Sequence, residues 1–153
     1  MDAVIFQKDD IVYDERTLLK CAFGCEDYGY NHTCPSAPNF LGLDMYKRVF
    51  QKYSCGLIIH CDNQKTSQEI SFQIESRAFC DGYYWAFSLS DCCLCSECGA
   101  SCGAPCRNRG KARPAFHSVG IDVFKTVHKF GLPLKTLTAK DEPQNWYSAV
   151  FID

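Results

Sequence analysis

A cysteine-rich segment near the middle of the chain limits fold and function more than any other feature. Residues 91–112 read DCCLCSECGASCGAPCRNRGKA and contain six of the twelve cysteines. Cys92, Cys95 and Cys98 are three residues apart, and Cys106 follows after a gap of seven residues. This pattern is typical of loops that wrap around a cubane iron–sulfur cluster, because each two-residue step brings the next thiolate to another corner. The spacing therefore predicts that Cys92, Cys95, Cys98 and Cys106 bind a [4Fe–4S] cluster.

Disulfide bonds are one alternative use for so many cysteines. Twelve in 153 residues is slightly below the density of disulfide-stapled secreted chains, and such chains are usually shorter and lack a core. A chain of this length buries roughly 68–70 % of its unfolded surface. Its start, MDAVIFQKDD, has neither a basic segment nor the apolar run of about 7–15 residues typical of a secretory leader. With no run of about 20 apolar residues for a membrane span, we expect a cytoplasmic protein whose clustered cysteines bind metal or perform redox chemistry.

Zinc is the second alternative at this loop. Structural zinc sites usually combine two short cysteine pairs that are separated by a dozen or more residues. The pairs Cys95/Cys98 and Cys102/Cys106 are separated by three residues and leave two loop cysteines unused. The spacing favours a cluster, and a zinc-stabilised scaffold remains the alternative.

A second group of cysteines lies near the N-terminus, in KCAFGCEDYGYNHTCPSAP. Cys21, Cys25 and Cys34 form the pattern C-x₃-C-x₈-C, and Pro35 follows directly. Proline fixes φ and removes a backbone donor, which suits a rigid ligand turn. A radical-SAM motif is excluded because Tyr28 occupies the position of its third cysteine. Three thiols hold a cluster only if a fourth ligand completes the set or one iron stays open.

Cys80 is the first candidate for that fourth ligand, because it lies just before the predicted strand that leads into the loop. Cys102, Cys55, Cys61 and His32 are the other candidates. If Cys80 completes the N-terminal site, the protein is predicted to hold a relay of two clusters. If no fourth thiol binds, one iron of that cluster stays open, and the protein is predicted to be an enzyme or a cofactor-maturation factor that binds a substrate there. Three buried thiols without metal are the remaining alternative for this group.

Three motifs recur in one known family. They are K-C-x₃-C-x-x-Y-G…C-P, then C-x-x-C-x-x-C…P-C-R…A-R-P, then G-I-D-V, and together they span about residues 19–130. Through these three motifs the chain resembles an uncharacterised family of cysteine-rich, predicted metal-binding proteins that are common in anaerobic archaea and bacteria. The resemblance implies metal or cluster binding and brings no established reaction. The matching positions are Lys20, Cys21, Cys25, Tyr28, Gly29, Cys34, Pro35, Cys92, Cys95, Cys98, Pro105, Cys106, Arg107, Ala112, Arg113, Pro114 and Gly120 to Val123.

Helical and strand patterns alternate along the rest of the chain. Tyr46, Val49, Phe50 and Tyr53 follow the i, i+3, i+4, i+7 spacing of an amphipathic helix, and Asp122 is placed to cap a later one. This order predicts an α/β fold, with a small, mostly parallel sheet, flanking helices and a cysteine-rich cluster-binding loop, in a single domain over residues 1–153. The predicted elements are helices at 43–53, 66–79 and 123–130 and strands at 55–62, 83–90 and 146–153.

The predicted topology also places the two cysteine groups. In open α/β sheets, ligands bind outside the carboxyl ends of the strands. Cys61 ends the first predicted strand, and the cysteine-rich loop begins directly after the second. We therefore expect both groups to lie near this edge of the sheet.

Charge and missing motifs limit the partners. The formal net charge is −2, and a cubane held by four thiolates makes the chain more acidic, which disfavours nucleic-acid binding. The basic run RNRGKAR (107–113) either offsets the charge of the cluster as a solvated loop or docks an acidic redox partner. No phosphate-binding loop or nucleophile elbow is present. We expect an iron–sulfur protein that acts in electron transfer or as an accessory subunit of a partner enzyme, without nucleic acid or membrane.

Overall fold

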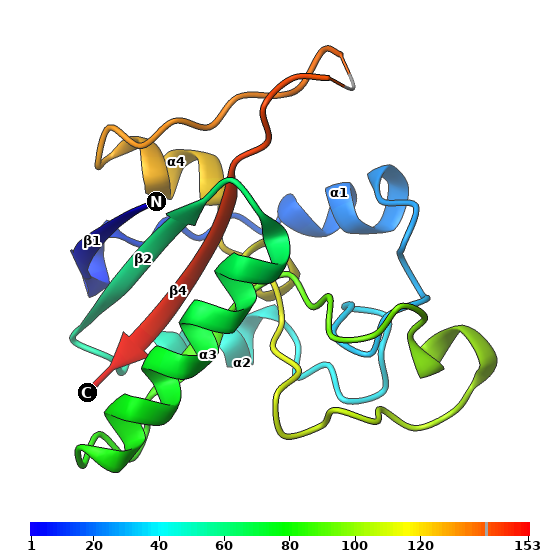
Figure 1. Ribbon diagram of the computed structural model, residues 1–153, viewed down its shortest axis with the longest axis horizontal. Helices are drawn as coiled ribbons and strands as arrows, with labels where there is room; N and C mark the ends of the chain where they lie inside the picture. The colour runs from blue at the N-terminus through cyan, green and yellow to red at the C-terminus, as the bar shows by residue number, and fades with distance from the viewer. Residues whose placement is uncertain (140) are drawn as a thin grey trace.

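The structure is a computed structural model that describes residues 1–139 and 141–153. Among these residues, four strands form one sheet in the order β1-β2-β4-β3, and all neighbouring strands are antiparallel (Figure 1). The strands are β1 (Asp2–Gln7), β2 (Cys55–Cys61), β3 (Phe87–Leu89) and β4 (Trp146–Ile152). The α-helices are α1 (Thr17–Gly24), α2 (Leu43–Phe50), α3 (Gln64–Cys80) and α4 (Val123–His128). Short 3₁₀ turns are η1 (Lys8–Asp10), η2 (Gly99–Cys102) and η3 (His117–Val119).

The prediction of a mostly parallel sheet is wrong. Helix α3 connects β2 to β3, and these two strands do run in the same direction. However, the last strand, β4, lies between them and pairs antiparallel with both. Strand β1, which the sequence analysis did not predict, pairs antiparallel with the other side of β2. Hydrophobic periodicity indicates that a segment is a strand, but it does not determine which strand lies beside it.

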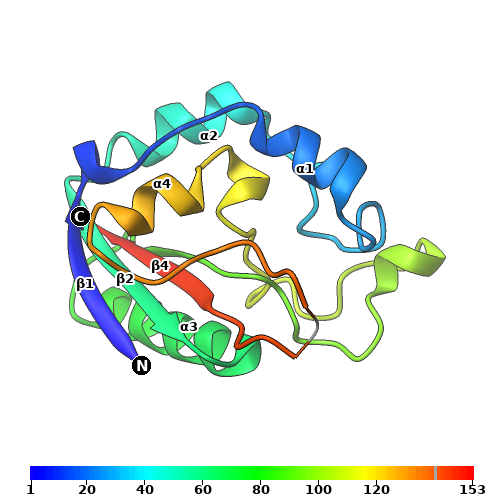
Figure 2. The same cartoon turned by 90° about the horizontal axis from the view of Figure 1, so that it is seen from above.

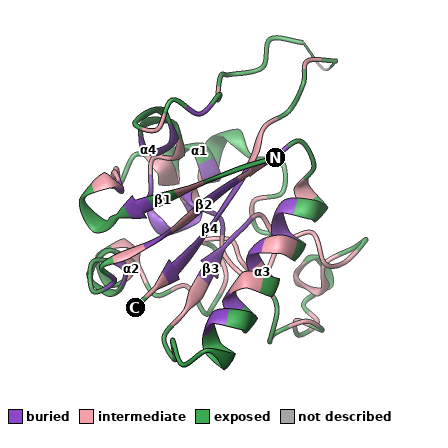
Figure 3. Ribbon diagram, turned by 60° about the vertical axis from the view of Figure 1, so that its left-hand side comes forward, coloured by how far each residue is buried: buried purple, intermediate pink, exposed green. Residues whose placement is uncertain are grey.

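The sheet has a buried layer on each face. Side chains alternate along a strand, so Tyr147, Ala149 and Phe151 of β4 join the main core, whereas Val150 packs towards α3. Ser148, also on the α3 side, shares a hydrogen bond of 3.0 Å with a serine of that helix. Figure 2 shows the sheet between α3 on one side and α2 and α4 on the other. Figure 3 shows that the buried residues are concentrated along β2 and β4.

The starts of α3 and α4 agree with the local sequence signals. The Asp122 carboxylate accepts a hydrogen bond of 2.9 Å from the backbone N–H of Lys125, which confirms Asp122 as the cap of α4. Asn63 caps α3 in the same way through Thr66. The strand predicted at 83–90 is shorter, because residues 83–86 form a turn after Gly82, whose φ is +101°. None of the helices in the described ranges is long and apolar enough to span a bilayer.

A buried ion pair attaches the end of the cysteine-rich loop to the sheet and α3. Glu75 of α3 accepts hydrogen bonds from the backbone N–H and the hydroxyl of Ser88, at 2.7 and 2.6 Å, and from Nε of Arg113 at 2.9 Å. The Arg113 guanidinium also lies over the rings of Phe72 and Phe87, at 5.5 and 5.0 Å from their centroids. Because Arg113 follows the last predicted ligand of the loop, this pair fixes where the loop returns to the core.

Candidate metal centre

The four cysteines that the spacing predicts as cluster ligands lie together. Cys92, Cys95, Cys98 and Cys106 line one small cavity of about 30 Å³. The chain turns back between Cys98 and Cys106 through η2 and Gly103, which has a φ of +72° that favours glycine. The thiols surround the cavity and do not converge on one point, since within the described part of the chain no three His, Cys, Asp or Glu side chains are placed to hold a single ion.

The two additional loop cysteines have other environments. The backbone N–H and the thiol of Cys93 donate to Oε1 of Gln68, at 3.0 and 3.2 Å. Cys102 is exposed, and its thiol donates to the carbonyl of Gly99 at 3.4 Å. Neither residue lines the cavity of the other four. The structure thus separates the four predicted ligands from the two extra cysteines, and metal binding by the four stays a prediction.

Amide side chains lie beside two of the four thiols, those of Cys92 and Cys95. Burial raises the pKa of Cys92, and the side chain of Gln68 acts in the opposite direction. Gln68 is 3 % exposed, and its Nε2 has no hydrogen-bond partner among the described residues. Nδ2 of Asn108 donates to Sγ of Cys95 at 3.1 Å. Amide donors beside thiols favour negative charge on sulfur, so this donor set fits a metal held by thiolates.

Sequence reasoning missed these amides. The pattern of apolar residues predicts α3, but it carries no signal that Gln68 on that helix reaches the loop, more than twenty residues later. Asn108 lies inside the loop. Asparagine is common in turns, so its presence there does not indicate a contact with a cysteine thiol.

The N-terminal cysteines gather at the end of α1. Cys21 and Cys25 are four residues apart and lie on one face of the chain as the helix ends. Burial is the largest cause that raises the pKa of Cys21 to about 11, and the nearby thiols of Cys25 and Cys34 contribute to the same increase. Asp91, at the start of the cysteine-rich loop, also contributes to this increase. Cys25, Cys34 and the start of the loop therefore lie near enough to Cys21 to interact with it electrostatically.

The candidate fourth ligands lie elsewhere, except for His32. Cys80 is exposed at the C-terminal end of α3, on the opposite side of the molecule from α1 (Figures 1 and 2). The structure therefore does not bring Cys80 to the other three. Cys55 lies at the start of β2, and Cys61, at its end, is 1 % exposed in the layer beneath α3. Cys102 is exposed in the loop.

The two cysteine groups lie side by side, as expected. Nδ2 of Asn31 donates to the carbonyl of Cys92 at 3.3 Å, and Nε2 of His32 donates to the carbonyl of Ala104 at 2.8 Å. Although the sheet is antiparallel overall, β2 and β3 run in the same direction, so their carboxyl ends share one edge. The loop leaves from this edge, and the segment after α1 folds against it (Figure 1).

A comparison with known protein families assigns the chain to one of them. The family described as "Predicted metal-binding protein (DUF2284)" matches residues 4–152. The chain belongs to this family. The match includes both cysteine groups and nearly the whole sheet, and it confirms the resemblance to a cysteine-rich, predicted metal-binding family. No curated protein and no solved structure matches the chain. Family membership and the cysteine content together support metal binding.

Proposed function

We propose that Cys92, Cys95, Cys98 and Cys106 hold a [4Fe–4S] cluster and that the protein serves in electron transfer or as a redox accessory subunit of a partner enzyme. One observation carries the proposal: four cysteines with cluster-type spacing line a single cavity that excludes the other two loop cysteines. When bound, such a cluster supplies one-electron transfer at a potential that the surrounding protein adjusts.

The surroundings of the cavity support a redox role. The hydrogen bond from Asn108 to Cys95 stabilises negative charge on sulfur, and hydrogen bonds to cluster sulfurs are one of the factors that set the reduction potential. Ser96 and Glu97, between two of the ligands, are exposed. The cavity therefore lies close to the surface, which exchange of electrons with a partner protein requires.

The basic run at 107–113 supplies a smaller docking surface than its sequence implies. Arg113 is engaged with Glu75 inside the protein. Arg107, Arg109 and Lys111 are exposed, and Arg107 also donates to the carbonyl of Glu97 at 2.8 Å. These three side chains, next to the cysteine-rich loop, support contact with an acidic partner.

Metal analysis of protein purified without oxygen tests the cluster. About four iron and four sulfide per chain are expected for one cubane, and about eight iron if Cys21, Cys25 and Cys34 hold a second one. Cys95→Ala is expected to lose most of the iron, whereas Cys102→Ala, a cysteine of the same loop outside the cavity, is expected to keep it. Zinc without iron, or full iron in Cys95→Ala, would refute the assignment.

The redox role has a separate test. Asn108→Ala removes a donor to Cys95, and we expect the variant to keep its iron and to show a lower midpoint potential, because the reduced cluster loses stabilisation of its extra negative charge. Redox titration followed by electron paramagnetic resonance measures that potential. A cluster that accepts no electron at any accessible potential, or a potential unchanged in Asn108→Ala, would contradict this part of the proposal.

A further inference from the structure

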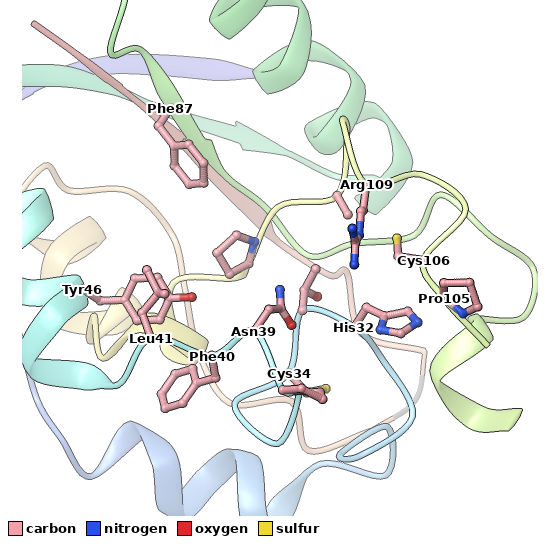
Figure 4. Close-up of a pocket in the computed structure, with 14 residues that line it drawn as sticks. His32, Cys34, Asn39, Phe40, Leu41, Tyr46, Phe87, Pro105, Cys106 and Arg109 are labelled. Carbon is pink, nitrogen blue, oxygen red and sulfur yellow. The ribbon is translucent and has the colours of Figure 1, made fainter. Parts of the chain in front are cut away.

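A second, larger cavity lies beside the two cysteine groups and has no role in the proposed function. Its volume is about 520 Å³, within the range of about 300–1,000 Å³ that is usual for small-molecule sites. Cys34 of the N-terminal group and Cys106 of the loop both line it (Figure 4). Its walls come from residues 32–46, from β3 and from the end of the cysteine-rich loop, so it exists only because these segments fold together.

One end of this cavity is polar and carries a free cation. Arg109 is the one charged residue in the lining formed by described residues. Each of the other five arginines has a hydrogen-bond partner, but no such bond or ion pair engages Arg109 within the described ranges. Figure 4 shows its guanidinium directed towards the space between His32 and Asn39. The His32 ring is held in place by its bond to the Ala104 carbonyl.

The other end is apolar and largely aromatic. Phe40, Tyr46 and Phe87 line it together with Leu41 and Pro114. The rings of Phe40 and Tyr46 pack against each other with centroids 5.5 Å apart. Rings held in this way form a preorganised surface on which an apolar group of a ligand is buried at little entropic cost.

Charge selects the class of ligand. A metal held by four thiolates next to this cavity carries a net charge of about −2, whether it is zinc or a cubane in its common oxidised state. The single guanidinium of Arg109 balances one negative charge of a ligand, and the described lining holds no second cation that would balance another. Arginine matches a carboxylate through two parallel hydrogen bonds.

We propose that this cavity binds a small organic acid. Its single carboxylate lies on Arg109, and its aromatic or branched aliphatic group packs on Phe40, Tyr46 and Phe87. The inference goes beyond the proposed electron-transfer function. It depends on the cavity and on Arg109, and it holds for a zinc protein as well as for an iron–sulfur protein.

Fluorine NMR on anaerobically purified, metal-loaded protein tests the inference. The probes are 4-fluorophenylacetate and its neutral isostere 4-fluorophenylacetamide. We expect the acid to bind about tenfold more tightly than the amide, because only the acid makes charge-assisted hydrogen bonds with Arg109. Equal binding of the two probes, or no binding of the acid, would overturn the proposal.

Matched arginine variants localise the effect. Arg109→Gln is expected to abolish the preference for the acid, whereas Arg77→Gln, an exposed arginine paired with Asp81 at the far end of α3, is expected to retain it. An unchanged preference in Arg109→Gln overturns the site. If Arg109→Gln loses its metal, the proposed ligand site is also overturned, because Arg109 is then needed to stabilise the metal centre. The metal content of the same samples tests the cluster assignment separately. If the protein contains zinc without iron, the cluster assignment fails, but the ligand-binding results still decide the present proposal.

Discussion

Replacing Glu75 by glutamine is expected to destabilise the protein strongly, because Arg113 then stays buried without a counter-ion. The two side chains are 11 % and 12 % exposed, so solvent screens their interaction very little. Removing one partner of a buried ion pair typically costs about 3–5 kcal/mol. For a chain of this length, each kcal/mol lowers the unfolding midpoint by about 2–4 °C, so a decrease on the order of 10 °C is expected.

Thermal unfolding followed by circular dichroism, with metal release measured in parallel, tests this value. Glu69→Gln is the matched control, since Glu69 lies on the same helix and its pair with Lys65 is exposed and 3.9 Å long. That variant is expected to stay within about 0.5 kcal/mol of the wild type. The double variant Glu75→Gln/Arg113→Met removes both charges and is expected to recover much of the loss. A Glu75→Gln midpoint equal to that of Glu69→Gln would refute the reasoning.

The same pair predicts a pH dependence. Burial by itself raises the pKa of Glu75, but the hydrogen bonds from Arg113 and Ser88 outweigh it and hold this pKa below the ordinary value of 4.5. The stabilisation is therefore complete above about pH 4.5 and is lost as the pH falls through the pKa of the folded protein. The difference in stability between wild type and Glu75→Gln should be constant near neutrality and become smaller below about pH 4.5. A difference that grows on acidification would contradict this sign.

Three further predictions concern packing, thiol reactivity and metal removal. Gly56→Ala places a Cβ 2.3 Å from a backbone oxygen of β4 and should cost about 1–3 kcal/mol of unfolding free energy, whereas Gly110→Ala, with no atom within 4 Å, should be nearly neutral. In metal-free protein, iodoacetamide should modify the exposed Cys25 much faster than Cys21, because Cys21 is 4 % exposed and has a pKa of about 11. Mass spectrometry measures the two rates, and equal rates would count against the site geometry. Metal removal should accelerate hydrogen exchange in residues 91–113 and leave β2 and β4 protected, and equal exchange in both regions would show that the loop does not depend on metal.

Local patterns could be interpreted from the sequence because their physical causes are local. Cys92, Cys95 and Cys98 are separated by two residues each, so chain connectivity alone keeps their thiols within reach of one cavity. The start of α4 was predictable for a similar reason, since the carboxylate of Asp122 bonds to a backbone group three residues later. The motifs of both cysteine groups were also sufficient to indicate the family.

Only the tertiary structure decided how distant segments meet. The direction of the sheet depends on β4, which follows β2 by more than eighty residues and lies between β2 and β3. Cys80 lies one residue before a turn and looked close to the loop in sequence, yet the seventeen residues of α3 carry it to the opposite end of the molecule. Arg113 and Arg109 belong to one basic run, but one is buried against α3 and the other lines a cavity. Such differences arise from packing between segments, which residue spacing along the chain does not encode.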